Sequence, residues 1–140
     1  MPNVIDLLKA DHRKVEELFA KFESAEEHEK AELVKTILHE LKVHTGAEET
    51  HVYPHLDERD PESEELEDHA QHEHSEIKEH MEHLEVLDEG FDEEVAKLKE
   101  TVTHHVEEEE TKLFPHMEEV IPELLDEMGT HVEQYKAEHA

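Results

Sequence analysis

The sequence predicts an all-α protein: an up-down-up-down four-helix bundle with a short additional C-terminal helix. Apolar residues recur at spacings of three and four along four long segments, which is the period of an amphipathic helix. Three glycines and five prolines occur among 140 residues, and long stretches of Glu, Leu, Lys, Ala and His favour helices joined by short turns. No stretch alternates apolar and polar residues as a half-buried strand would. Short connections between long helices are typical of antiparallel bundles.

The first two predicted helices have recognisable ends. The first begins after Asn3, a favourable N-cap residue, with Asp6 in its first turn. Its inward-facing stripe consists of Ile5, Leu8, His12, Val15, Phe19 and Phe22. The second helix covers about residues 26–53 and ends before Pro54, because proline disfavours helix in the residue before it. Its stripe consists of Leu33, Ile37, Leu41, His44, Glu48 and Val52.

The next two predicted helices repeat this plan. The third covers about residues 64–88, with Ser63 as its cap and Gly90 in the turn that follows. Its stripe consists of Leu66, Ala70, His74, Ile77, Met81 and Leu84. The fourth covers about residues 92–113, and Pro115 ends it. Its stripe consists of Val95, Leu98, Val102, His105, Glu109 and Leu113.

The length of the chain fits one domain, residues 1–140. The bundle is expected over about residues 3–115, followed by a helical extension over about residues 116–140. A shorter fifth helix in this extension starts near Pro122 and is expected to lie against the bundle.

Composition and charge restrict the partners. The formal net charge of −29 repels nucleic-acid phosphates and anionic lipid, so neither nucleic acid nor membrane is expected as a partner. The absence of cysteine excludes disulfides and thiolate metal sites. The N-terminus does not have the pattern of a signal peptide, and no stretch of the sequence is apolar enough for a membrane span. We therefore expect a cytoplasmic protein, a monomer or weak homo-oligomer.

The sequence contains an internal repeat. The segment HTGAEETHVYPHL, which begins at His44, matches HVEEEETKLFPHM, which begins at His105, with six identical positions. Upstream, the apolar pattern that follows His12 matches the pattern that follows His74. The chain therefore consists of two helical hairpins of one pattern, each with a histidine on its first helix and His-x-x-x-Glu on its second.

Six polar residues interrupt the apolar stripes: His12, His44, Glu48, His74, His105 and Glu109. A buried carboxylate without a partner is strongly disfavoured, whereas two carboxylates facing four imidazoles are stable around cations. Residues four apart share one helix face, so each His-x-x-x-Glu pair can converge on neighbouring ions. The set suits two metal ions bridged by Glu48 and Glu109. Nitrogen and oxygen ligands without sulfur fit iron or manganese, leave zinc as an alternative and disfavour copper(I).

Any single histidine is a weak signal, because the chain has 16 of them. Eight of the remaining ones are expected on the surface: His28, His39, His69, His72, His80, His83, His104 and His139. Four lie near helix ends or in the tail and have no predicted place: His51, His55, His116 and His131. The structural alternative is a metal-free acidic bundle in which the inward polar residues tolerate apolar replacement.

The ordered motifs closely resemble those of hemerythrin-like, or HHE cation-binding, domains over about residues 4–116. The matching elements are Asp11-His12, His44-x-x-x-Glu48-Glu49 before Tyr53-Pro54, His74, and His105-x-x-x-Glu109-Glu110 before Phe114-Pro115. The resemblance implies a four-helix bundle with a non-heme di-iron centre bridged by two carboxylates and an oxo or hydroxo group. It implies that the six stripe residues are the ligands. Members of this family carry or sense oxygen, handle iron, or act on peroxide or nitric oxide.

The chain departs from the oxygen-carrying hemerythrins at two positions. Those proteins have a second histidine one turn before the third-helix ligand, where this chain has Ala70. They also have an aspartate with a different spacing on the last helix, where this chain has Glu109. One iron is therefore expected to be open or to take another ligand, for which the candidates are His80, Tyr53, Glu73 and water. An open position favours reactivity with small molecules over reversible oxygen carriage.

Two functions follow as hypotheses. The first is a di-iron protein that binds or turns over a small oxidant, namely dioxygen, hydrogen peroxide or nitric oxide. The second is an iron-sensing or iron-binding module without turnover, whose folding depends on the metal. Peroxide decomposition of the catalase type is one candidate activity, and no residue is assigned as catalytic, because no separate general base stands out in the sequence.

Overall fold

The computed structural model describes residues 3–140, and these residues contain helices but no strand, as the all-α prediction requires. The four long helices are α1 (Val4–Ser24), α2 (Glu27–His51), α3 (Pro61–Glu85) and α4 (Asp92–Glu108). The C-terminal part comprises the π-helical turn η2 (Glu109–Leu113), α5 (Phe114–Val120), the 3₁₀ turn η3 (Pro122–Leu124) and α6 (Leu125–Glu138). The predicted domain also includes Met1 and Pro2, which lie outside the described residues.

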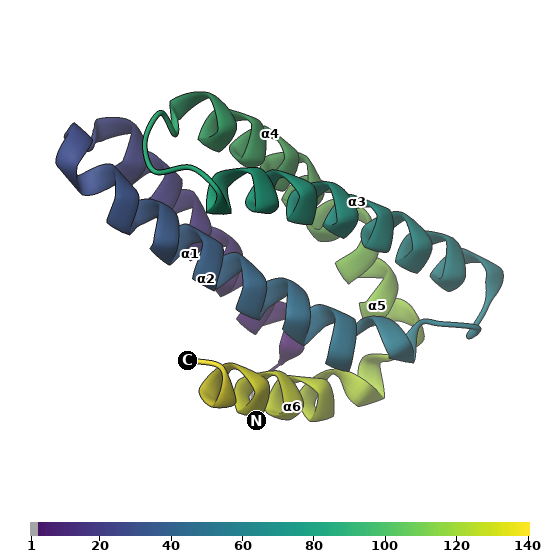
Figure 1. The fold of residues 1–140 in the computed structure, drawn as a ribbon. Coiled ribbons are helices and arrows are strands. Elements are labelled where there is room, and N and C mark those ends of the chain that lie inside the picture. Colours follow the sequence, from purple (N-terminus) through teal and green to yellow (C-terminus); the bar gives the residue numbers. More distant parts are fainter. Residues whose placement is uncertain (1–2) are drawn as a thin grey trace.

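The long helices form two hairpins that pack against each other (Figure 1). Helix α1 packs along α2, and α3 packs along α4. Contacts between α2 and α3 and between α1 and α4 join the two hairpins. Helix α6 lies against α1 and α2, which confirms the predicted fifth helix and places it on the first hairpin. Among residues 3–140, no helix combines the length and apolar character that crossing a bilayer requires.

Capping residues account for the starts of α1 and α3. Asn3 caps α1 as predicted, because its side chain accepts a hydrogen bond from the Ile5 backbone N–H at 2.8 Å. The prediction of Ser63 as the cap of α3 is wrong. Asp60 caps this helix by accepting the Ser63 backbone N–H at 2.8 Å, and Pro61 occupies the first helical position. Proline is favoured there because its missing N–H would have no helical partner, so α3 begins three residues earlier than expected.

The two repeated prolines have different effects on the chain. Pro54 follows the end of α2 at His51, as predicted, and lies in the 3₁₀ turn η1 (Tyr53–His55). Pro115 does not end the fourth helix: the chain passes through the π-helical turn and continues as α5. Pro115 lies in the first turn of α5, where a missing N–H costs little.

The buried apolar residues form two separate clusters. The distal cluster lies toward the α1–α2 and α3–α4 turns and includes Phe19, Phe22, Ile37, Leu41, Ile77, Leu84, Leu98 and Val102. The terminal cluster lies toward α5 and α6 and includes Val4, Leu8, Val52, Tyr53, Ala70, Phe114, Met117 and Met128. The predicted stripe is buried with few exceptions, such as Leu33, which is half-buried while Val34 beside it is buried. The six predicted polar residues lie in the layer between the two clusters.

Candidate metal centre

All six predicted polar residues are buried and come together in one layer of the bundle. Helix α1 supplies His12, α2 supplies His44 and Glu48, α3 supplies His74, α4 supplies His105, and the π-helical turn begins at Glu109. Glu48 is 0% exposed and Glu109 is 1% exposed, a degree of burial that a carboxylate tolerates only with charged or hydrogen-bonding partners. A π-helical turn within a helix is often found at functional positions.

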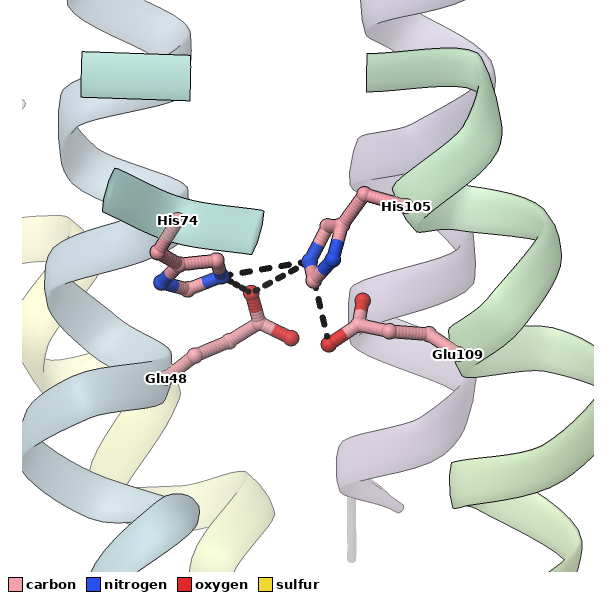
Figure 2. Close-up of side chains that lie close together, drawn as sticks. All are labelled: Glu48, His74, His105 and Glu109. Atoms are coloured by element: carbon pink, nitrogen blue, oxygen red, sulfur yellow. Dashed lines mark hydrogen bonds and ion pairs between the residues drawn. The ribbon is translucent and has the colours of Figure 1, made fainter. Parts of the chain in front are cut away.

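The first group of facing side chains contains Glu48, His74, His105 and Glu109 (Figure 2). Each offers a ligand atom within 4.8 Å of the others. His74 Nε2 lies 3.1 Å from Glu48 Oε1 and 3.2 Å from His105 Nε2. His105 Nε2 lies 3.4 Å from Glu109 Oε2. These separations match those between ligand atoms around one metal ion with bonds of about 2.0–2.2 Å.

The second group contains His12, His44 and Glu109. His12 Nε2 lies 3.1 Å from Glu109 Oε1, the carboxylate oxygen that the first group does not use. His44 Nε2 lies 3.1 Å from Glu48 Oε1. Each of the two glutamates therefore faces histidines of both hairpins, Glu109 through its two oxygens and Glu48 through Oε1.

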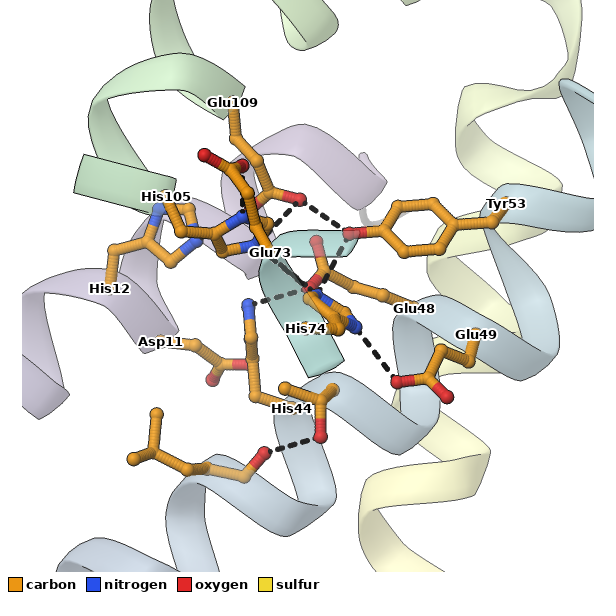
Figure 3. Close-up of polar contacts among 12 residues, drawn as sticks. Asp11, His12, His44, Glu48, Glu49, Tyr53, Glu73, His74, His105 and Glu109 are labelled. Atoms are coloured by element: carbon orange, nitrogen blue, oxygen red, sulfur yellow. Dashed lines mark hydrogen bonds and ion pairs between the residues drawn. The ribbon is translucent and has the colours of Figure 1, made fainter. Parts of the chain in front are cut away.

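Each of the four histidines is held at its outer nitrogen by a carboxylate; Figure 3 shows the contact between His74 and Glu49. The Nδ1–H of His12 donates to Glu110 at 2.7 Å, that of His44 to Asp11 at 2.9 Å, that of His74 to Glu49 at 2.8 Å, and that of His105 to Glu73 at 2.8 Å. Such contacts fix the ring orientation and tautomer and leave Nε2 directed at the centre.

The outer carboxylates follow the internal repeat. Glu49 and Glu110 directly follow the two central glutamates, Glu48 and Glu109, and each holds the first-helix histidine of the opposite hairpin. Asp11 and Glu73 directly precede the first-helix histidines, and each holds the second-helix histidine of its own hairpin. This role was not predicted for the four residues, although their paired positions in the repeat are the signal that could have identified them.

Cations at the edge of the bundle contact the outer carboxylates in turn. Arg13 donates to Glu110 at 2.5 Å, and Lys78 donates to Glu49 at 2.7 Å. Lys136, which lies on α6, donates to Asp11. The C-terminal helix is thereby connected to His44 through a single carboxylate.

The buried histidines and carboxylates of this layer form a network of ion pairs. Burial opposes charge on His44, yet Glu48 and Asp11 outweigh it and raise the pKa of His44 to about 10. Burial likewise opposes charge on Glu48, but the facing histidines hold its pKa well below the ordinary value. His44 Nε2 and Glu48 Oε2 are nevertheless buried without a hydrogen-bond partner among residues 3–140.

The comparison with known families agrees with this geometry. A family model described as the hemerythrin HHE cation binding domain matches residues 3–117. The chain belongs to this family. The match confirms the resemblance found in the sequence and covers the whole metal centre, whereas α6 lies beyond it. A search of curated proteins and a search of solved structures found no match.

Within this hemerythrin HHE domain, the candidates for the ligand missing at Ala70 differ in position. Ala70 is buried in the terminal cluster. Tyr53 lies against the centre, with its hydroxyl donating to Glu109 Oε2 at 2.9 Å and 2.9 Å from His74 Nε2. Glu73 is engaged with the outer nitrogen of His105. His80 belongs to a separate group with His83 and Glu94, so Tyr53 is the candidate that the structure brings to the centre.

The hemerythrin HHE centre has a small cavity on one side. The cavity measures about 10 Å³ and is lined by Asp11, His12, Val15, Leu41, His44, Thr45, Ile77, Val102, His105 and Val106. A single water needs about 10–15 Å³ of such space, so the cavity is about the size of one water molecule. Phe114 stacks on His12 at a ring distance of 5.9 Å and covers it from the terminal cluster.

The other histidines mostly lie where the sequence predicted. Seven of the eight predicted surface histidines are exposed: His28, His39, His69, His72, His83, His104 and His139. The prediction is wrong for His80, which is half-buried because it packs beside Glu94 at the α3–α4 interface. Of the unplaced ones, His116 is buried and hydrogen-bonds Ser63 Oγ at 2.7 Å, a structural role at the start of α3. His51, His55 and His131 are half-buried.

Proposed function

We propose that the chain is a non-heme di-iron protein that binds or turns over a small oxidant: dioxygen, hydrogen peroxide or nitric oxide. The six ligands are divided between two irons. His12 and His44 would hold one iron, His74 and His105 would hold the other, and Glu48 and Glu109 would be shared between them.

The observation that supports this proposal most strongly is the pair of shared carboxylates. Glu109 turns one oxygen to His12 and the other to His105. A single cation would need only one of the two groups of facing side chains, whereas two neighbouring cations would use both groups. The unpartnered Nε2 of His44 and Oε2 of Glu48 fit a bound cation, which would replace their missing hydrogen bonds. Nitrogen and oxygen donors without sulfur suit iron.

The small cavity supports an oxidant of a few atoms. It adjoins His12 and His44 and is otherwise walled largely by aliphatic side chains, which exclude bulk water from the centre. Its volume of about 10 Å³ excludes an organic substrate. Dioxygen, hydrogen peroxide and nitric oxide each have two heavy atoms and are slightly larger than this cavity, so a small side-chain shift would accompany their binding.

The residues around the centre have different roles. Iron, when bound, supplies the electrons exchanged with the oxidant. The outer carboxylates hold the imidazole rings in place, and the aliphatic walls keep water out. Burial and the nearby Glu109 raise the pKa of Tyr53 well above its ordinary value, so its hydroxyl keeps a proton 2.9 Å from Glu109 Oε2. Tyr53 is therefore the nearest protonated hydroxyl to the bridging carboxylates.

We further propose that the described chain is one domain with an up-down-up-down bundle. Along α1 the terminal cluster precedes the polar layer, and the distal cluster follows it. Along α2 this order is reversed, along α3 it is the same as in α1, and along α4 and the following η2 it is reversed again. Alternating order is what successive antiparallel helices produce. The cytoplasmic location stays a prediction from the sequence.

The first experiment is the metal content of the purified protein, together with its visible spectrum before and after addition of peroxide or azide. About two irons per chain and a spectrum that responds to the small molecule are expected. Replacement of His44 and His105 by alanine should remove iron from both positions, while replacement of the exposed His28 and His39 should not. One metal or none per chain, after reconstitution with ferrous iron, would overturn the di-iron proposal.

One observation favours the alternative of an iron-sensing module. Lys136 on α6 contacts Asp11, which holds His44, so loss of the metal changes the charges beneath the C-terminal helix. A sensor should show chelator-dependent proteolysis of α6 and no turnover of peroxide. An oxidant-binding protein should keep α6 protected and respond spectroscopically to the oxidant.

A further inference from the structure

A second group of metal-ligating side chains lies outside the centre, at the interface of α3 and α4. His80 and His83 lie one turn apart near the end of α3, and Glu94 lies in the first turn of α4. One ligand atom of each lies within 4.8 Å of those of the other two. His80 Nδ1 is 3.9 Å and His83 Nδ1 is 3.6 Å from Glu94 Oε2.

Two polar atoms of this group have no hydrogen-bond partner within the described chain. His80 Nδ1 and Glu94 Oε2 are both buried, and neither has a hydrogen-bond partner among residues 3–140. Lys97 approaches Glu94 only through the other oxygen, Oε1, at 3.4 Å. A buried polar atom without a partner is costly, so two of them 3.9 Å apart indicate a place for a further group between them.

The distances fit a small divalent cation. Tetrahedral zinc with bonds of about 2.0–2.1 Å places its ligand atoms about 3.3 Å apart. The observed separations of 3.6 and 3.9 Å exceed this by a few tenths of an ångström, which side-chain rotation can close. Two imidazoles and one carboxylate, with a fourth position for water, are a ligand set that zinc accepts.

We propose that His80, His83 and Glu94 form a second, mononuclear divalent-cation site, and that zinc is its preferred ion. The site ties the C-terminal end of α3 to the first turn of α4. Lys97 remains bound to Oε1 and does not compete for Oε2.

The site is separate from the di-iron centre. His80 follows His74 by six residues, which is about 9 Å along a helix. Ile77 of the distal cluster lies between the two sites along α3. The proposal therefore does not depend on the function of the centre.

The test is zinc binding to protein whose centre is already loaded with iron, measured by equilibrium dialysis and elemental analysis. The wild-type protein should bind one zinc per chain, and zinc-edge X-ray absorption should show two imidazole ligands. The H80A/H83A variant should bind zinc more than about 100-fold more weakly than the wild type. Removal of a residue that only supports a ligand lowers metal affinity by at most about 100-fold. E94Q, which keeps the side-chain size, should also weaken binding.

The matched control is H39A/H72A, which removes two exposed histidines and should leave zinc binding unchanged. Iron content and helical circular dichroism should be the same in all variants. Absence of stoichiometric zinc in the iron-loaded wild type would overturn the proposal, and so would equal zinc binding in H80A/H83A and in the control. If H80A/H83A fails to fold, E94Q alone decides, because zinc retained at wild-type affinity contradicts the site.

Discussion

Tyr53 and Phe114 occupy equivalent positions of the internal repeat but contact the metal layer in different ways. The Tyr53 hydroxyl donates to Glu109 and lies 2.9 Å from His74 Nε2. The Phe114 ring instead stacks on His12 with an interplanar angle of 8°. A centre built from two similar hairpins is therefore polar on the side of His74 and apolar on the side of His12.

Replacement of Tyr53 by phenylalanine tests this asymmetry. The ring should still fill its place, because phenylalanine already occupies the equivalent position, so iron content should stay near that of the wild type. The hydrogen bond to Glu109 is lost, which should destabilise the metal-free protein by about 1–3 kcal/mol and change the visible response to peroxide or azide. Y135F, on α6, is the control. A Y53F protein with an unchanged spectral response would show that the hydroxyl has no role at the centre.

Replacement of Asp11 by asparagine tests the outer carboxylates. Asparagine can still accept the His44 Nδ1–H, but it no longer raises the basicity of the ring. Ferrous-ion affinity, measured by competition with a chelator, should fall about 10- to 100-fold. Glu40→Gln is a matched control, since Glu40 pairs with Lys14 and contacts no ligand. Equal losses in both variants would indicate a general effect of charge.

The metal-free protein should become less stable as the pH rises from neutrality. The pKa of His44 is about 10 in the folded chain and about 6.5 in an unfolded one. A raised pKa contributes stability that is fully present below pH 6.5 and is lost as the pH rises through 10. Urea unfolding between pH 7 and pH 10 measures this loss, which iron should reduce because the metal replaces the proton. A stability that increases over this interval would contradict the assignment.

Gly46 and Tyr135 should be energetically coupled. A Cβ at Gly46 would overlap the Tyr135 hydroxyl, so G46A alone must displace this residue of α6. In a Y135A background the clash is absent, and G46A should stabilise the protein by about 1 kcal/mol through helix propensity. A double-mutant cycle by chemical denaturation measures the difference. Equal changes in the free energy of unfolding caused by G46A in both backgrounds would show that Tyr135 of α6 does not pack against Gly46.

Much of the fold was predictable because the apolar period is regular. The inward stripes of α1 and α4 are buried at every predicted position, and the six polar interruptions lie together. The repeat made this prediction stronger than any single histidine could. The carboxylates that hold the outer nitrogens of the histidines were harder to predict. The chain has 42 acidic residues, and nothing in the composition distinguishes Glu73 or Glu110 from a solvated surface glutamate.

The structural predictions were wrong where a local sequence signal is compatible with two different structures. Pro54 and Pro115 share the same repeat context, yet only the second is followed by helix. After Pro115, Met117 and Ile121 are buried in the terminal cluster, so packing favours a continued helix. Ser63 is an acceptable cap, but Asp60 with Pro61 behind it is a better one. His80 appeared to be a surface residue because its partner, Glu94, lies on another helix.

The polar layer also determines how the molecule unfolds. It divides the apolar interior into the distal and terminal clusters. Small cores are individually marginal, so all-or-none melting of residues 3–140 depends on what joins them. Continuous helices and the buried ion pairs of the polar layer connect the two clusters, and a bound cation would add further links between them. We therefore expect bound metal to make unfolding more cooperative, and its removal to make the two ends of the bundle melt less cooperatively.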